Sequence, residues 1–389
     1  MNMTGQGRVA AIDVLRGVSL FGIFQMNVQL FAFPLAGYMR PPLVTPLHGL
    51  DLAAWLFTHV ICEFKFITVF SMLFGAGIVL AKPDNRTFWS RQGWLLFFGL
   101  LHAYFVWFGD ILVIYAIGGA FMWKARFWPS AKQARYGVAL FCAPLVLVPA
   151  LELSVALLPA EMQKMMLEGF SPTPVMLARE VAINRGPWLQ QLLFRFGQTS
   201  EGELFACLLH VWRAAGGMAI GASLTTSGVL LGQRPELETK LVKWGLGIGT
   251  PLMLTSAALL LAFDFPPSSG MSLGLVSYVA SLPMGLGFLG LGLKAVRCWS
   301  GPVLRALAAA GRMSLTHYLS QSLIASVIFY GFGFGLHGQL ARWQLIPLAA
   351  AIWAVQVASS PMLERVFVRG PFERAWRALV RLTSTPRHA

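Results

Sequence analysis

Long apolar stretches alternate with short polar connections over almost the whole chain. About 20 mainly apolar residues are needed for a helix to cross roughly 30 Å of hydrocarbon. Ten stretches meet or approach this length, the fourth being the shortest: residues 12–33, 52–80, 92–108, 111–123, 136–158, 204–231, 244–263, 272–293, 313–335 and 345–364. The pattern predicts an all-α, polytopic membrane bundle of about ten transmembrane helices.

The composition supports an integral membrane protein. Of the 389 residues, 56% are apolar and 12% are charged, and the mean hydropathy is +0.65. A soluble protein carries about twice that charged fraction. No connection is long enough for a soluble domain, so residues 1–389 are predicted to form a single membrane domain. The longest connection, at about 159–203, is predicted to be an extracytoplasmic surface segment or lid.

The basic residues predict the orientation. Alternate connections place 21 of the 30 Lys and Arg residues on one side and six on the other, while Arg16, Lys65 and Arg213 lie within spans. Because cytoplasmic loops hold the excess of basic residues, both termini are predicted to be cytoplasmic. The net charge of +14 is scattered over short loops. This distribution favours membrane lipids with anionic headgroups as partners and argues against nucleic acid.

The cysteines suggest neither a metal site nor a disulfide framework. All four are isolated, without Cys-x-x-Cys or Cys/His ligand spacing. We therefore expect no metal and no bound redox cofactor. The first apolar stretch is too long for a signal peptide and contains Asp13 and Arg16, so we expect it to be retained as a span.

An acid and a base stand at the start of the first span. Asp13 and Arg16 are three residues apart and share one helix face. The predicted topology puts them near the cytoplasmic boundary and puts Asn27, about 21 Å further along, near the outer one. Ionisable groups inside a span mark either a structural pair or a working site. Two roles stay open for this pair: pinning the helix, or receiving the phosphates of a ligand.

The outer half of the predicted bundle collects further polar side chains. They are Asn27, His59, Glu63, His102, Asp110, His210 and Arg213. His102 and Asp110 are eight residues apart, about 12 Å along a continuous helix, so we expect them to line one cavity mouth rather than to touch. As alternatives, His102 bonds to a neighbouring backbone and Asp110 caps the following helix. Lys65, near mid-depth, either pairs with an acid or extends to the interface.

Five ordered motifs make the chain resemble the YeiB family of bacterial inner-membrane proteins. They occupy residues 13–27, 65–77, 99–115, 311–322 and 370–377. The resemblance implies a multi-pass protein of the bacterial inner membrane. His317 departs from the pattern, because the family usually has Asn there, so His317 is not proposed as a catalytic residue.

The Asp-x-x-Arg-Gly start is similar to that of a wider set of membrane acyltransferases, including the heparan-α-glucosaminide N-acetyltransferase type. This similarity implies that an acyl group passes from a cytoplasmic donor such as acyl-CoA to a small or lipid-linked acceptor on the other side. His102, helped by Asp110 or Asn27, would be the general base. The residues predicted to bind donor or substrate are Asp13, Arg16, Lys65, Arg312 and Gln321. The alternative is a transporter or lipid-handling protein without catalysis, and a homo-oligomer is left open.

Overall fold

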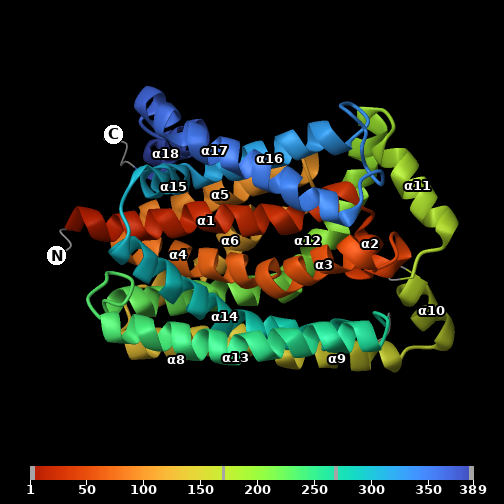
Figure 1. Ribbon diagram of the computed structural model, residues 1–389, viewed down its shortest axis with the longest axis horizontal. Helices are drawn as coiled ribbons and strands as arrows, with labels where there is room; N and C mark the ends of the chain where they lie inside the picture. The colour runs from red at the N-terminus through yellow and green to blue at the C-terminus, as the bar shows by residue number, and fades with distance from the viewer. Residues whose placement is uncertain (1–4, 169–170, 267–269, 385–389) are drawn as a thin grey trace.

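The computed structural model describes residues 5–168, 171–266 and 270–384, and these are mainly helical (Figure 1). The helices are α1 (Gly5–Ala32), α2 (Leu35–Met39), α3 (Gly49–Phe57), α4 (Lys65–Ala81), α5 (Asn85–Phe105), α6 (Leu112–Ala120), α7 (Met122–Ala125), α8 (Ser130–Cys142), α9 (Pro144–Ala156), α10 (Ala160–Glu168), α11 (Pro174–Asn184), α12 (Trp188–Thr226), α13 (Pro235–Ala262), α14 (Gly270–Cys298), α15 (Pro302–Arg312), α16 (Ser314–Phe329), α17 (Leu345–Phe367) and α18 (Pro371–Ser384). Within the described ranges there is no β-strand, which confirms the predicted all-α class.

Six helical segments among the described residues are long and apolar enough to cross a bilayer. They are Ala10–Ala32, Gly49–Ala81, Ser130–Ala156, Pro235–Ala262, Met271–Cys298 and Arg342–Phe367. Each of the ten predicted stretches overlaps a helix, but the number ten stays a prediction. Helices of this length and composition identify a membrane protein.

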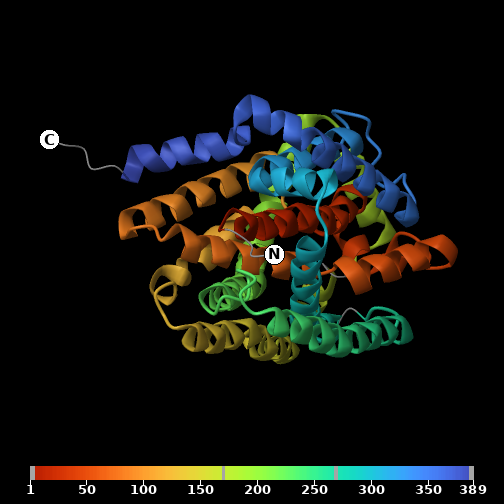
Figure 2. The same ribbon diagram turned by 60° about the vertical axis from the view of Figure 1, so that its left-hand side comes forward.

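The long helices run side by side, and α1 lies among them. It packs against α4, α15, α16 and α17, whereas α13 and α14 form a closely packed pair farther out (Figures 1 and 2). The start of α1 and the whole of α18 lie at one end of the bundle, which we call the terminal end. The short helices α2, α10 and α11 lie at the opposite end. Asp13 and Arg16, near the start of α1, therefore lie towards the terminal end, and Asn27, near the end of α1 at Ala32, lies towards the opposite end.

Close backbone contact fixes the first span against α15. A Cβ atom on Gly17 would lie 2.2 Å from the carbonyl oxygen of Leu307, and one on Gly311 would lie 1.8 Å from that of Asp13. Glycine at both positions lets the two helices touch through their backbones. The Gly17 carbonyl also accepts a hydrogen bond from Trp353 Nε1 at 2.9 Å. The opening motif and the motif at 311–322 thus meet in one helix crossing.

The second predicted span is interrupted. A π-helical turn at Thr58–Cys62 follows α3, and α4 begins only at Lys65. Between them Phe64 has a φ of 62°, in the left-handed region that a bulky side chain rarely adopts. Such interruptions of a membrane helix are tolerated where neighbouring groups satisfy the freed backbone. The break places polar side chains of this span inside the bundle.

The predicted long loop is shorter than expected. The helices α10 and α11 occupy part of residues 159–203, and α12 already begins at Trp188. Residues 188–203 therefore extend a helix rather than a surface loop. The remaining segment lies at the end of the bundle opposite the terminal end (Figure 1).

Candidate functional site

His102 and Asp110 are joined by a hydrogen bond of 2.7 Å between His102 Nδ1 and Asp110 Oδ1. The expectation that they would not touch is wrong, because α5 ends at Phe105 and the chain turns back before α6 begins at Leu112. Both side chains are buried, with exposed fractions of 2% and 4%. The turn converts a separation of eight residues into a direct contact.

The other oxygen of Asp110 holds the start of α6. Asp110 Oδ2 accepts a hydrogen bond from the Val113 amide at 2.7 Å, so the predicted capping role is present together with the histidine contact. This packing requires a glycine on α5. A Cβ on Gly99 would lie 2.6 Å from the Val113 nitrogen and 3.0 Å from Asp110 Oδ2. The carboxylate is therefore oriented from two directions.

Tyr318 on α16 is a third member of this site that the sequence did not single out. Its hydroxyl donates to Asp110 Oδ1 at 3.5 Å and accepts from the Ile111 amide at 3.2 Å. Its ring lies 5.2 Å from the ring of His102, centroid to centroid. Tyr318 directly follows His317 in the motif at 311–322. Its place in that motif is the sequence feature that could have identified it as a candidate site residue.

The second ring nitrogen of His102 is free of hydrogen bonds among the described residues. Nε2 is buried and has no hydrogen-bond partner among those residues. Because the carboxylate of Asp110 favours a proton on Nδ1, Nε2 is left with a lone pair. Asn27 is half-buried and, within the described ranges, makes no hydrogen bond to His102 or Asp110. The structure thus brings together two of the three predicted catalytic residues.

Asp13, Arg16 and Arg312 meet at the terminal end of the bundle. Asp13 lies between the two arginines, 3.7 Å from Arg16 and 3.6 Å from Arg312. Arg312 also makes two hydrogen bonds to Glu364, at 2.6 and 2.7 Å, and Arg16 donates to the Leu73 carbonyl at 3.0 Å. The group ties together α1, α4, α15 and α17. The side chain of Arg312 remains 40% exposed, so it is within reach of a solute.

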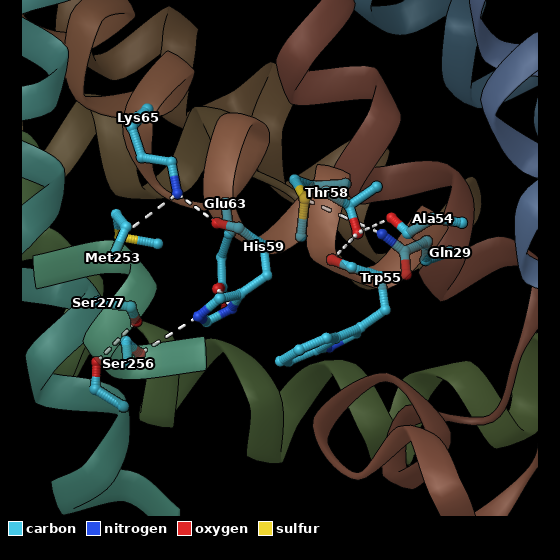
Figure 3. Close-up of polar contacts among 12 residues, drawn as sticks. Gln29, Ala54, Trp55, Thr58, His59, Glu63, Lys65, Met253, Ser256 and Ser277 are labelled. Atoms are coloured by element: carbon cyan, nitrogen blue, oxygen red, sulfur yellow. Dashed lines mark hydrogen bonds and ion pairs between the residues drawn. The ribbon is translucent and has the colours of Figure 1, made fainter. Parts of the chain in front are cut away.

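Lys65 and the pair of His59 and Glu63 lie at the helix break (Figure 3). The carboxylate of Glu63 contacts His59 Nδ1, and His59 Nε2 lies 3.2 Å from the Ser256 hydroxyl. Lys65 is fully buried, donates to the His59 carbonyl and lies 3.6 Å from the sulfur of Met253. His59 and Glu63, four residues apart in the predicted outer half of the bundle, are therefore in direct contact.

Gln321 lies in a buried network between α16 and α17 and is held by other protein groups. Its amide donates to Gln356 at 2.8 Å, and Gln356 in turn donates to the carbonyl of His317 at 3.2 Å. His317 Nε2 lies 2.8 Å from the hydroxyl of Ser360. These contacts account for His317 as a side chain that joins two helices.

Glu373 of α18 caps the first turn of α16, a role that sequence reasoning missed. One of its oxygens accepts from the amides of Leu315 at 2.7 Å and Thr316 at 3.1 Å, and the other accepts from the Thr316 hydroxyl. Burial raises the pKa of the Glu373 carboxyl, while these hydrogen bonds lower it by a smaller amount. The motif at 370–377 therefore supplies the contact that anchors the C-terminal helix α18 to α16.

Replacing Glu373 with Ala is expected to lower the free energy of unfolding by about 1–2 kcal/mol, because the start of α16 loses its cap. Thermal unfolding of the purified protein in detergent measures the change. The adjacent, exposed Arg374 provides the control, since Arg374→Ala removes a side chain without a capping contact. Equal losses of stability in the two variants would contradict the capping role.

These features define a helical membrane protein with a histidine–aspartate pair buried in its bundle. The family model "Protein of unknown function (DUF418)" matches residues 224–383. The chain is 29% identical to the uncharacterized protein YeiB of Escherichia coli (strain K12), covering 97% of this chain and 98% of that protein. It is 27% identical to the uncharacterized protein YxaH of Bacillus subtilis (strain 168), covering 97% and 96%. These matches support the resemblance to the YeiB family that the five motifs indicated. No solved structure matches the chain.

Proposed function

We propose that this protein is a membrane-embedded acyltransferase in which His102 is the general base. The observation that carries the proposal is the pairing of His102 Nδ1 with Asp110 while Nε2 keeps a buried lone pair. A histidine oriented in this way by a carboxylate can accept a proton from a hydroxyl or an amine. The wider similarity of the Asp-x-x-Arg-Gly start to membrane acyltransferases agrees with this reaction class.

The proposed reaction moves an acyl group from a thioester donor such as acyl-CoA. His102 Nε2 takes the proton of the acceptor's hydroxyl or amine as the acceptor atom attacks the thioester carbonyl carbon. The carbon–sulfur bond then breaks, and the departing thiolate receives the proton from His102. Asp110 stabilises the imidazolium that exists between these two transfers. No resident cofactor is needed for this sequence of steps.

The terminal end of the bundle is the proposed entrance for the donor. Arg16 and Arg312 place two partly exposed guanidinium groups there, and guanidinium groups bind phosphate oxygens well. We place this end in the cytoplasm of the bacterial inner membrane, in agreement with the excess of basic residues on this side. The acceptor is extracytoplasmic or lipid-borne.

Access to His102 requires a movement. Its side chain is buried, and neither Arg16 nor His102 lines either of the two surface hollows described for this chain. The two hollows are bordered by Trp244 and by Trp123, respectively. The proposal therefore includes an opening between the two ends of the bundle during the reaction.

Turnover of acyl-CoA by the purified protein tests the proposal. Release of free thiol with a short-chain donor is measured for the wild type and for His102→Ala, in the presence of lipid and soluble acceptors. We expect thiol release by the wild type and its loss in the variant. Absence of turnover with every donor, together with saturable solute flux into liposomes, would contradict the proposal.

Transport without catalysis is the second candidate function. The observation that favours it is the helix break, where Glu63 and Lys65 lie inside a span. Interrupted membrane helices with ionisable side chains commonly form the substrate sites of transporters. Flux that persists in His102→Ala would favour this function.

A further inference from the structure

Arg213 of α12 is a buried basic residue that no carboxylate of the described residues contacts. Its guanidinium carbon lies 3.8 Å from the ring centroid of Phe64 and 4.5 Å from that of Tyr278. The side chain is 4% exposed, and its Nε is buried without a hydrogen-bond acceptor among the described residues. Aromatic rings attract a cation, but they do not neutralise its charge.

Lys65 brings a second positive charge to the same place. It follows Phe64 directly, and the ring of Phe64 lies against the guanidinium of Arg213, so both basic side chains adjoin the helix break. The groups that Lys65 contacts are the His59 carbonyl and the sulfur of Met253, and both are uncharged. Glu63, the carboxylate whose charge acts on both cations, is in contact with His59 instead.

The charges at the break do not balance. Around the break, the described side chains include two basic groups, Lys65 and Arg213, and one carboxylate, Glu63, which contacts His59. A buried cation without a counter-ion destabilises the folded state strongly, and ionisable groups inside a membrane usually mark a working site. We infer that Arg213 and Lys65 form a binding site for an oxyanion, either a phosphate or a carboxylate group, at the break between α3 and α4.

The surroundings suit an anionic group. The guanidinium supplies several donors in a planar fork, which matches phosphate and carboxylate oxygens. Ser256 on α13 and Tyr278 on α14 lie on neighbouring helices, where the Ser256 hydroxyl pairs with His59 Nε2 at 3.2 Å and the Tyr278 hydroxyl donates to the Phe141 carbonyl at 2.7 Å. Side chains of four elements therefore converge on the break. This site does not depend on acyl transfer, since it contains neither His102 nor Asp110.

Thermal unfolding of the delipidated full chain in detergent tests the site. The melting temperature is followed over concentration series of inorganic phosphate and of acetate at constant ionic strength and pH. We expect a saturable rise in the melting temperature, because a ligand that binds the folded state stabilises it by mass action. Arg213→Gln should raise the apparent Kd for these anions by at least about 30-fold. Lys65→Met should also raise this Kd.

Arg195 provides the matched control. It is also a buried arginine of α12, it packs near the ring of Tyr330, and it donates to the Phe105 carbonyl at 2.8 Å. Arg195→Gln should keep the wild-type Kd whatever its effect on the melting temperature itself. If Arg213→Gln does not fold, Arg213→Lys is used in its place. Lysine retains the positive charge but lacks the planar set of guanidinium donors, so this variant should also weaken binding.

Vesicles separate the two sources of the oxyanion. Protein in phosphatidylcholine vesicles is compared with protein in vesicles that also contain phosphatidylglycerol. Stabilisation by phosphate or acetate that Arg213→Gln removes indicates a soluble ligand. Stabilisation only by phosphatidylglycerol, lost in the same variant, indicates a lipid headgroup. No saturable effect of any probe on the wild type, or an unchanged Kd in Arg213→Gln, would overturn the inference.

Discussion

Replacing Asp110 with Asn is expected to lower the rate of acyl transfer by on the order of 10³- to 10⁴-fold, the loss that accompanies a wrong histidine tautomer in a comparable pair. The amide would present a donor to His102 Nδ1, so the proton of the ring would move to Nε2. That nitrogen would then be unable to accept the proton of the acceptor. The rate of thiol release from an acyl-CoA donor, measured at saturating donor, reports the change.

The same substitution leaves the cap of α6 largely intact. An Asn side-chain oxygen can accept the hydrogen bond from the Val113 amide that Asp110 Oδ2 now accepts. We therefore expect a small change in melting temperature beside the large change in rate. Because a lost cap would lower both, the combination distinguishes a catalytic pair from a structural one.

Asp84 supplies a matched control for this experiment. It caps α5, accepting from the Thr87 amide at 2.8 Å, but it has no histidine partner and lies in an exposed connection. Asp84→Asn should leave thiol release unchanged. A wild-type rate in Asp110→Asn would remove the basis for assigning His102 as the base.

The fold was largely predictable because the apolar stretches that a bilayer requires can be recognised directly from the sequence. The break at Phe64 was not predictable, since an aromatic residue carries no turn propensity and adopts its left-handed conformation through tertiary packing. The beginning of α12 at Trp188 was missed for a related reason. Helices can continue beyond the hydrocarbon, where polarity no longer marks them.

The candidate site was predictable in its residues but not in its geometry. A charged or polar side chain in an apolar run attracts notice, and this signal found His102, Asp110 and Arg213. The contact between His102 and Asp110 depends on how the chain turns after Phe105, and Tyr318 reaches it from a helix far along the chain. Spacing along one helix contains no information about either contact.

Gly221→Ala is expected to lower the free energy of unfolding by about 3 kcal/mol, at the upper end of the usual effect of overpacking. A Cβ on Gly221 of α12 would lie 1.9 Å from the carbonyl oxygen of Met72 on α4. A Cβ on Gly75 would meet the carbonyl oxygen of Met218 at the same distance. The atom in the way is backbone in both cases, so the helices must separate. This crossing positions Arg213, two turns earlier on α12, against the helix break.

Gly93→Ala makes the same chemical change on α5, where a Cβ would meet nothing within 4 Å. This variant should gain about 0.5–1 kcal/mol, because Ala restricts the unfolded chain more than Gly does. We therefore expect unfolding in detergent, by heat or by denaturant, to show changes of opposite sign in the free energy of unfolding for the two Gly→Ala variants. Stabilisation by Gly221→Ala would show that α4 and α12 are not in backbone contact, and the placement of Arg213 beside Phe64 would then lose its support.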